Sequence, residues 1–365
     1  MMRIALLGPA NSIHLQRWAN ALAARGHAVR LISQHPTDAG HLHPAIEIEW
    51  LPHRGGAGYL LNARKLRATL SDWRPDLLNA HYASGYGTTA MLCGHAPCLL
   101  SVWGSDVYAF PHQGRLKAWL LRANLRHATA LASTSEAMAD EVRRLTPERR
   151  DIAIIPFGVD LERFAPDGSG RAAGMVTIGT IKSLAPSYGI DLLLRAFAGV
   201  ANDADVRAAG LACRLLVVGD GPERSALQAL AKTLEIDTAT TFAGAVPHAD
   251  VPLWLNRLDI YAAPSRLESF GVAVIEASAC AVPVVVTHIG GLPEVVVAER
   301  TGLIVPSEDV PPLQAALKRL VLDARLREEL GRQGRRHVAE TYEWERCVDR
   351  MERCYERTLQ LARHA

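Results

Sequence analysis

The feature that most constrains this chain is a regular alternation of short apolar runs with longer amphipathic segments. The runs have the length of β-strands, and the segments between them, such as residues 14–27, carry apolar side chains at helical spacing. Strands and helices that alternate in this way form a parallel sheet covered by helices. The predicted strands of the first region are residues 3–8, 28–33, 46–52, 76–82, 97–104, 129–134 and 151–158.

The alternation stops at residues 161–174, LERFAPDGSGRAAG, which are rich in Gly, Pro and Asp and lack periodicity. It then resumes. The predicted strands of the second region are residues 175–181, 213–221, 240–246, 259–264, 282–287 and 301–306. A chain of 365 residues is too long for one ordinary core and suits two.

We therefore predict two Rossmann-like α/β domains, residues 1–167 and 168–343, facing a central cleft. Ligands in such folds bind at the carboxyl ends of the strands. The last segment, residues 344–365, is amphipathic and strongly charged. We expect it to form a helix that crosses back onto the N-terminal domain.

The overall charge excludes a general nucleic-acid binder, because the net charge is only +2. The first 170 residues are mildly basic, with 18 Lys and Arg against 14 Asp and Glu. The six cysteines show no zinc spacing, which favours buried thiols in a reducing compartment. No signal peptide is recognisable, and no apolar stretch is long enough to cross a membrane. We expect a cytoplasmic protein that contacts a membrane at most peripherally.

Familiar motifs of other enzyme classes are missing from the sequence. The first strand is followed by LLGPANSIH rather than a dinucleotide-binding glycine pattern, and no Walker A, G-x-S-x-G or H-E-x-x-H sequence occurs. A D-x-D pair, Asp203 and Asp205, follows a predicted helix in a polar stretch. We interpret it as a solvated loop and expect neither a metal site nor a cofactor.

Two carboxylates stand out in the apolar stretch PSRLESFGVAVIEASACAVPVVV. Glu268 precedes a predicted helix at 271–280, where the helix dipole alone would favour an anion. Glu276 lies within that helix between Ile275 and Ala277, and its sequence neighbours offer no donor. A buried carboxylate needs hydrogen-bond donors from elsewhere in the fold or from a ligand. Sugar and ribose hydroxyls are suitable donors.

These residues carry a resemblance to a known family. The stretch from Pro264 to Val296, with its E-x7-E pair, resembles the signature of the retaining glycosyltransferases of family 4. The segments IPFGVDLERF and GDGPERSAL and the opening LLGPANSIHLQRWANALAARGH are also similar to that family and occur in its order. The resemblance implies the two-domain GT-B fold, with the acceptor bound mainly by the first domain and a nucleotide-sugar by the second.

The resemblance also implies roles for residues of the second domain. Glu268 would contact hydroxyls of the donor sugar, and Glu276 would contact the ribose hydroxyls. The backbone of Ser269, Phe270 and Gly271 would face the sugar or the diphosphate, where free N–H groups at a helix start suit an anion.

Further donor contacts are implied at three positions: Val246 would lie at the nucleobase, and Gly219 and Glu223 belong to the GDGPE segment. The family usually binds the diphosphate with an Arg and a Lys. Here Thr180 replaces the Arg, and Ser187-Tyr188 stand where Lys-Gly is expected. Lys182 is the one cation of this loop and becomes the candidate for the diphosphate, the alternative being an exposed surface lysine.

The first domain offers candidates on the acceptor side. Trp103 ends an apolar strand where many relatives have His, and Ser105 and Asp106 follow it. Asp106 would either bind sugar hydroxyls or cap the following helix, and we place it with Glu268 and Lys182 in the predicted catalytic set. His81, at another strand end, and His14, after the first loop, are further acceptor-side candidates, although a lone histidine is more often structural.

A basic amphipathic helix is predicted at residues 114–127, with Trp119 among its apolar residues. Its apolar side would pack on the core, while its basic side would be solvated or touch anionic lipid.

The sequence thus predicts a retaining hexosyltransferase that uses a nucleoside-diphosphate sugar and a glycan or lipid-linked glycan acceptor. The family's mechanism is front-face: the leaving phosphate helps to accept the acceptor proton, and the protein supplies positioning and electrostatics. Two alternatives stay open, namely a nucleotide-sugar epimerase of the same fold and a non-catalytic nucleotide- or glycan-binding partner.

Overall fold

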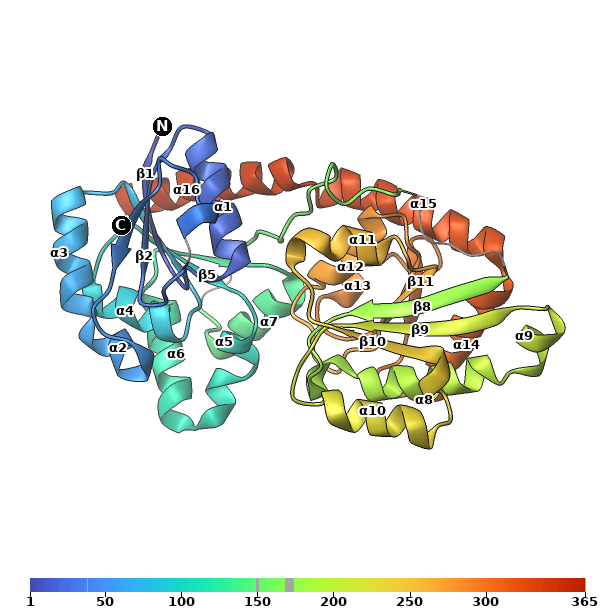
Figure 1. The fold of residues 1–365 in the computed structure, drawn as a ribbon. Coiled ribbons are helices and arrows are strands. Elements are labelled where there is room, and N and C mark those ends of the chain that lie inside the picture. Colours follow the sequence, from blue (N-terminus) through green and yellow to red (C-terminus); the bar gives the residue numbers. More distant parts are fainter. Residues whose placement is uncertain (38, 149–150, 168–173, 365) are drawn as a thin grey trace. The chain divides into compact units, whose positions relative to one another are not determined.

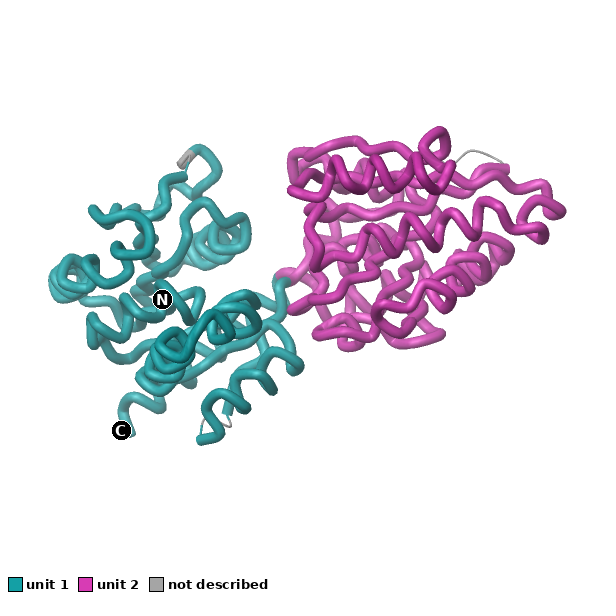
Figure 2. Tube along the Cα trace, turned by 90° about the horizontal axis from the view of Figure 1, so that it is seen from below, with its two compact units in different colours: residues 1–157, 345–365 teal, residues 158–344 magenta. Residues whose placement is uncertain are grey.

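The computed structural model describes residues 1–37, 39–148, 151–167 and 174–364 (Figure 1). The chain divides into two compact units (Figure 2). The first comprises Met1–Phe157 and Glu345–Ala365, and the second comprises Gly158–Trp344. The first unit is therefore discontinuous in sequence, because the C-terminal segment belongs to it.

The division at Phe157 lies before the boundary at residue 167 that we expected from the sequence. The residues that directly follow Phe157 contact the second unit. The backbone of Val159 donates to the carbonyl of Tyr342 over 2.8 Å. The side chain of Asn256 donates to the carbonyl of Ala165 over 2.9 Å.

The first unit contains, within its described residues, a seven-stranded parallel sheet in the order β3-β2-β1-β4-β5-β6-β7. Its strands are β1 (Arg3–Leu7), β2 (Ala28–Ser33), β3 (Glu47–Trp50), β4 (Leu77–His81), β5 (Cys98–Val102), β6 (Ala130–Ser133) and β7 (Ile152–Ile154). The chain builds outward from β1 in one direction and from β4 in the other. The order of strands therefore reverses between β1 and β4, where open α/β sheets form a ligand crevice.

Helices cover both faces of this sheet, because right-handed crossovers in opposite directions lie on opposite faces (Figure 1). On one face, α4 contacts α2, α3 and α6. The helices of this unit are α1 (Ile13–Ala24), α2 (Gly55–Leu61), α3 (Ala63–Trp73), α4 (Gly85–Cys93), α5 (Ser105–Tyr108), α6 (Arg115–His127), α7 (Glu136–Leu145) and α16 (Trp344–Arg363).

The C-terminal helix α16 packs on the first unit through a buried polar contact and a partly exposed ionic one. Tyr355 is fully buried, and its hydroxyl donates to Asn79 Oδ1 on β4 over 3.0 Å. Arg25, just after α1, pairs with three carboxylates of the helix, from Glu345, Asp349 and Glu352.

The second unit contains, among its described residues, a six-stranded parallel sheet in the order β10-β9-β8-β11-β12-β13. Its strands are β8 (Met175–Ile181), β9 (Ala212–Val218), β10 (Thr240–Gly244), β11 (Ile260–Ala263), β12 (Val284–Thr287) and β13 (Gly302–Val305). The order of strands reverses between β8 and β11.

Helices α8 (Ile190–Ala201), α10 (Arg224–Thr233) and α14 (Val310–Leu322) pack together, and α12 (Val272–Ala279) contacts α11 (Val251–Leu255), α13 (Leu292–Val295) and α15 (Ala324–Thr341). A short helix, α9 (Ala204–Ala208), precedes β9. The core against α8 consists of apolar residues such as Ile178, Leu193, Phe197 and Leu317, all fully buried. The expected α/β fold is confirmed, and the predicted strands correspond to those observed.

The segment between β3 and β4 forms two helices rather than one. The helices α2 and α3 meet at Asn62, which is the C-cap of the first and the N-cap of the second. The side chain of Asn62 is buried and donates to the carbonyl of His53 over 2.8 Å. This hydrogen bond stabilises the break between the two helices. None of the helices in the described ranges is both long and apolar enough to cross a membrane.

Candidate functional site

The reversal point of the second sheet brings together two of the charged residues singled out from the sequence. Lys182 follows β8 directly, and Glu268 lies in the loop after β11. Because β8 and β11 are neighbours, these two side chains meet: Lys182 Nζ donates to Glu268 Oε2 over 2.5 Å. An ion pair therefore lies at the crevice where this sheet is expected to bind a ligand.

This ion pair is largely removed from solvent, with side-chain exposures of 12% for Lys182 and 10% for Glu268. The ring of Tyr188 lies 4.6 Å from Lys182 Nζ. Burial lowers the pKa of the Lys182 ammonium, but the Glu268 carboxylate outweighs it and raises that pKa above its ordinary value. The lysine is thus a fixed cation. It is not the exposed surface lysine that the sequence left open.

Two glycines allow neighbouring loops to approach this pair closely. A Cβ on Gly219, which has φ 134°, would lie 1.8 Å from the carbonyl oxygen of Lys182. A Cβ on Gly290, which has φ 50°, would lie 1.8 Å from the carbonyl oxygen of Glu268. Any larger residue would displace the backbone that positions Lys182 or Glu268. Close packing therefore requires glycine at position 219, in addition to the donor role predicted for this residue.

Glu276 lies on α12 and is buried, with 7% of its side chain exposed. Its partner is His248, in the turn after β10: the two side chains are joined by a hydrogen bond of 3.0 Å between His248 Nε2 and Glu276 Oε1. The donor that the helix itself could not supply is therefore a histidine. The sequence did not single out His248, and its spacing of 28 residues from Glu276 carries no local signal.

The three residues predicted to contact the ligand through their backbone lie directly before α12. Gly271 is the N-cap residue, with φ 108°, and Ser269 and Phe270 precede it. The side chain of Phe270 is buried against Tyr342, with ring centroids 5.5 Å apart. The side chain of Phe270 is thus part of the packing of this unit.

The remaining donor-side residues surround the same sheet edge. Val246 is half-buried in the turn that leads to His248. Glu223 lies just before α10, and its Oε2 atom is buried without a hydrogen-bond partner among the described residues. Thr180, at the position where the family has Arg, is buried within β8.

In the first unit, the reversal point between β1 and β4 is occupied by aromatic rings. His81, at the end of β4, is fully buried, and its ring lies 4.8 Å from that of Trp103. Burial lowers the pKa of His81 to about 3, so the ring is neutral at physiological pH. Phe157 stacks on His14 at 4.1 Å and contacts Trp103 at 5.4 Å. The structure thus brings three of the acceptor-side candidates into one aromatic cluster.

Asp106 is held by the backbone of two loops. Its carboxylate is 1% exposed and accepts hydrogen bonds from the backbone of Ala83, Gly104 and Trp103, at 2.8, 2.8 and 3.2 Å. Burial raises the pKa of this carboxyl although the backbone N–H groups oppose it. The carboxylate joins the loop after β4 to the loop after β5. Ser105 beside it is exposed.

Metal ligands do not cluster in the parts of the chain that the structure describes: no group of three or more His, Cys, Asp or Glu residues there could hold an ion. Asp203 caps α9, accepting from the backbone of Asp205 over 2.9 Å. Both carboxylates pair with Lys318, at 2.8 and 2.7 Å.

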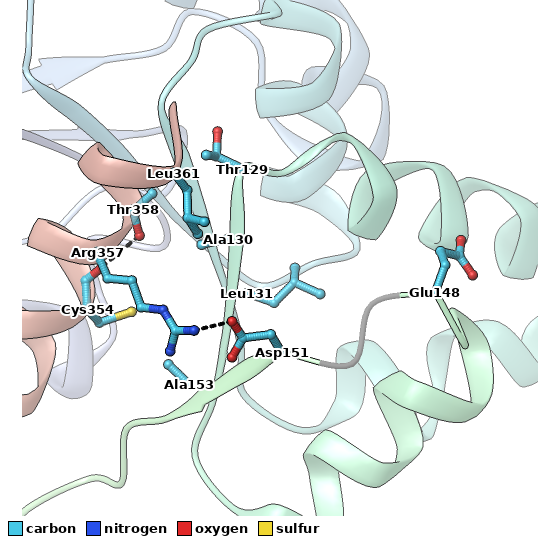
Figure 3. Close-up of a pocket in the computed structure, with 10 residues that line it drawn as sticks. All are labelled: Thr129, Ala130, Leu131, Glu148, Asp151, Ala153, Cys354, Arg357, Thr358 and Leu361. Atoms are coloured by element: carbon cyan, nitrogen blue, oxygen red, sulfur yellow. Dashed lines mark hydrogen bonds and ion pairs between the residues drawn. The ribbon is translucent and has the colours of Figure 1, made fainter. Parts of the chain in front are cut away.

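A cavity of about 230 Å³ lies away from either reversal point, between α16 and the strands β6 and β7 (Figure 3). It is lined by Thr129 and Ala130 at the start of β6 and by Asp151 just before β7. These are the amino ends of the strands, opposite to the edge at which α/β sheets bind ligands. Arg357 of α16 and Asp151 form an ion pair across the cavity wall.

Comparison with known proteins places this geometry in a family. The model of the family described as "Glycosyl transferases group 1" matches residues 165–337, and that of "Glycosyl transferase 4-like" matches residues 3–135. A D-inositol 3-phosphate glycosyltransferase of Saccharomonospora viridis is 35% identical over 237 residues, which are 61% of this chain and 54% of the relative. The chain spans about half the length of this relative and of two further curated relatives that it matches.

Two solved structures share the fold along the whole chain. Sucrose-phosphate synthase from Thermosynechococcus elongatus has a TM-score of 0.86 at 21% identity and covers 98% of this chain and 99% of its own. HepE from Anabaena, in complex with UDP and glucose, has a TM-score of 0.81 at 17% identity and covers 98% of this chain and 100% of its own. Both likenesses confirm the expected GT-B fold.

The matches in both units agree with the resemblance found in the sequence: the chain belongs to the group 1 glycosyl transferases of glycosyltransferase family 4.

Proposed function

We propose that this protein is a retaining hexosyltransferase that uses a nucleoside-diphosphate sugar as donor. The observation that carries the proposal is the pair of contacts that two carboxylates make at one sheet edge, Glu268 with Lys182 and Glu276 with His248. A nucleotide-sugar has hydroxyls at both ends of a diphosphate. One cation and two carboxylates at the same sheet edge match these groups.

The Lys182–Glu268 pair gives the donor two groups at once. A diphosphate that approaches Lys182 gains a buried ammonium, and Glu268 gains sugar hydroxyls as new donors in exchange. The two charges therefore stay compensated when the ligand enters, which avoids the cost of an unpaired buried charge. Lys182 and the backbone at the start of α12 would stabilise the charge that develops on the leaving diphosphate. We propose that no metal ion is needed for this step.

The family's front-face mechanism needs no dedicated base, which agrees with the environments of the first-unit candidates. Asp106 is engaged by backbone N–H groups, and His81 is buried and neutral. We therefore assign Asp106 to the support of two loops and the neighbouring aromatic cluster to the shape of the acceptor site. The proposed acceptor is a glycan or a lipid-linked glycan.

A lipid-linked acceptor would bring the first unit to a membrane surface, and two of its helices carry the appropriate side chains. Leu60 and Leu61 on α2 are 55% and 58% exposed, and Leu116 and Trp119 on α6 are 75% and 61% exposed. Both helices contact α4 on the same face of the sheet. Lys117 and the arginines of α6 add positive charge. Leu, Trp and basic residues together suit an anionic lipid surface.

The donor proposal is tested by thermal shift with UDP-, GDP- and ADP-sugars. The true donor should raise the melting temperature, because binding to the folded state stabilises by mass action. Transfer to acceptor and the configuration of the product then test the retaining reaction. Incubation with the donor alone should yield no epimer, and an epimer would favour an isomerase instead.

The membrane proposal has a separate test, which is co-sedimentation with vesicles. The protein should sediment with phosphatidylglycerol vesicles and not with phosphatidylcholine vesicles. Replacing both Leu116 and Trp119 by Ser should reduce sedimentation several-fold while donor binding is unchanged. Equal sedimentation of the variant and the wild type would contradict the assignment of this surface.

A further inference from the structure

The segment that leads into the second unit reaches the buried carboxylate Glu276 through one histidine. Arg163 lies in this segment, at residues 158–167, and its Nη2 atom is 3.0 Å from His248 Nδ1. The same guanidinium donates to the carbonyl of His248. On the other side of the ring, His248 Nε2 is 3.0 Å from Glu276 Oε1. An arginine, a histidine and a glutamate are thus joined in series.

The chemistry of the three groups fixes the direction of both hydrogen bonds. A guanidinium can only donate, so His248 Nδ1 accepts and carries no proton. An ionised carboxylate can only accept, so His248 Nε2 carries the proton and donates a hydrogen bond to Glu276. The ring is therefore neutral and held in the Nε2–H tautomer, because the partner of one nitrogen decides which nitrogen is protonated.

The position of Arg163 is itself determined by its surroundings. Asp160 Oδ1 accepts from the backbone of Glu162 and Arg163, at 3.0 and 3.1 Å. The guanidinium lies 5.4 Å from the ring of Phe164. Phe164 is buried, its ring lies 5.8 Å from that of His248, and its carbonyl accepts from Arg335 over 3.0 Å.

We propose that Arg163 and His248 form a relay that positions Glu276 for the ribose of the donor. Among the described residues, the side chain of Glu276 has one hydrogen-bond partner, His248, which contacts its Oε1 atom. The other oxygen is left to accept from a ribose hydroxyl. His248 is thus a positioning residue, and the inference rests on the proposed function.

The relay predicts that the protein discriminates ribose from 2′-deoxyribose through His248. Removing the His248 donor leaves Glu276 free to turn away from the hydroxyl, so affinity for the ribonucleotide should fall. Affinity for the 2′-deoxynucleotide, which lacks one of the two ribose hydroxyls, should fall less. We expect His248→Ala to weaken binding of the ribonucleoside diphosphate about tenfold. The loss of one hydrogen bond to a charged group has roughly that effect.

The first experiment measures the affinities of UDP, GDP and ADP, and of the 2′-deoxy counterpart of the one that binds, by calorimetry. His248→Ala and Arg163→Met should each reduce the preference for ribose, the histidine variant more. His248→Gln should restore part of it, because a Gln side-chain N–H can replace Nε2–H. Arg257→Met is the matched control: Arg257 stacks on Trp254 at 4.4 Å in the same unit and should have no effect.

Kinetics separate positioning from a general loss of structure. His248→Ala should raise the donor KM about tenfold and change kcat less than threefold, because the bond to ribose is made equally in the ground state and the transition state. A fall in kcat with an unchanged KM would overturn the ribose assignment.

The tautomer can be read without any ligand, by nitrogen NMR of the protein labelled with ¹⁵N-histidine. The signal that disappears in His248→Gln identifies His248. We expect a protonated Nε2 and an unprotonated Nδ1 in the wild type and a mixture of tautomers in Arg163→Met. A mixture already in the wild type would overturn the relay.

The outcomes distinguish this inference from the proposed function. If the wild type binds a nucleotide but its preference for ribose survives both relay variants, the relay is wrong and the proposed function stands. If the wild type binds no nucleotide, the proposed function fails and the ribose role fails with it, whatever tautomer is found.

Discussion

The two units have the same kind of sheet reversal but compensate the charges there in different ways. In the first unit, Asp106 is compensated by backbone N–H groups, and His81 is neutral among aromatic rings. In the second unit, Lys182 and Glu268 compensate one another through their side chains. A side-chain partner can be exchanged for a ligand, whereas a backbone partner cannot move away. The second unit is therefore suited to a charged donor, and the first presents a fixed surface.

The largest effect should come from breaking the exchangeable pair of the second unit. Lys182→Met leaves the Glu268 carboxylate buried without its cation, which should reduce the free energy of unfolding by about 3–5 kcal/mol. Urea denaturation measures this loss. The double variant with Glu268→Gln should regain most of the stability, because no charge is then left unpaired.

The same two variants should differ from each other in stability and not in activity. Both should lack measurable transfer, since each lacks the proposed phosphate cation. Full transfer by Lys182→Met would remove Lys182 from the site.

The next effect concerns the fixed carboxylate of the first unit. Asp106→Asn offers the backbone donors of Ala83 and Gly104 a single neutral oxygen, which should reduce the free energy of unfolding by about 2–3 kcal/mol. Nucleotide affinity, measured by calorimetry, should be unchanged. A large loss of nucleotide affinity in a stably folded variant would erase the proposed difference between the units.

A pH-dependent effect should follow from His81. Burial lowers its pKa to about 3 from an ordinary value of 6.5, so between these values the unfolded chain binds a proton that the folded chain does not. Stability contributed by the neutral ring is complete above pH 6.5 and is lost as pH falls. At pH 5 the loss should be about 2 kcal/mol relative to pH 8.

The check is to compare urea denaturation of the wild type and His81→Gln at pH 8 and pH 5. The variant should lose less stability on acidification by about that amount. Equal pH dependence in both proteins would mean that His81 is accessible to protons in the folded state.

The smallest effect should come from the partly exposed ion pairs between Arg25 and α16. Arg25→Gln should reduce the free energy of unfolding by about 1 kcal/mol, because two of the three carboxylates are about half exposed or more and such pairs gain little. The reduction should shrink further in 1 M NaCl, where surface charges are screened. A salt-independent loss as large as that of Lys182→Met would show that exposure does not separate these two groups of ion pairs.

The fold and part of the site could be predicted from the sequence because their signals are local. Strands and helices follow from the spacing of apolar residues, and Glu276 was recognisable as a carboxylate that its own helix leaves without a donor. Helix α4 was not predicted, since Gly85 and Gly87 are typical of a loop. The structure shows why position 85 requires glycine: the ring of Tyr59 occupies the space that a Cβ would fill.

The rest of the site depends on contacts between distant residues. His248 and Arg163 are 85 positions apart, and no periodicity connects them. The sequence left Asp106 open between a ligand role and a cap. Its actual partners are backbone groups of two loops, and residue types alone do not reveal such partners. Sequence thus indicated which residues are chemically unusual, and the fold decided what each one contacts.

The discontinuity of the first unit has a consequence for how the protein is made. Tyr355, which bonds to Asn79 in the buried face of that unit, is synthesised after the whole of residues 158–344. At ordinary translation rates this interval is about 10–40 s. During it, the surface that later receives Val348 and Met351 has no cover. The nascent first unit must wait on the ribosome with an open apolar face, while the second unit has all the residues it needs to fold.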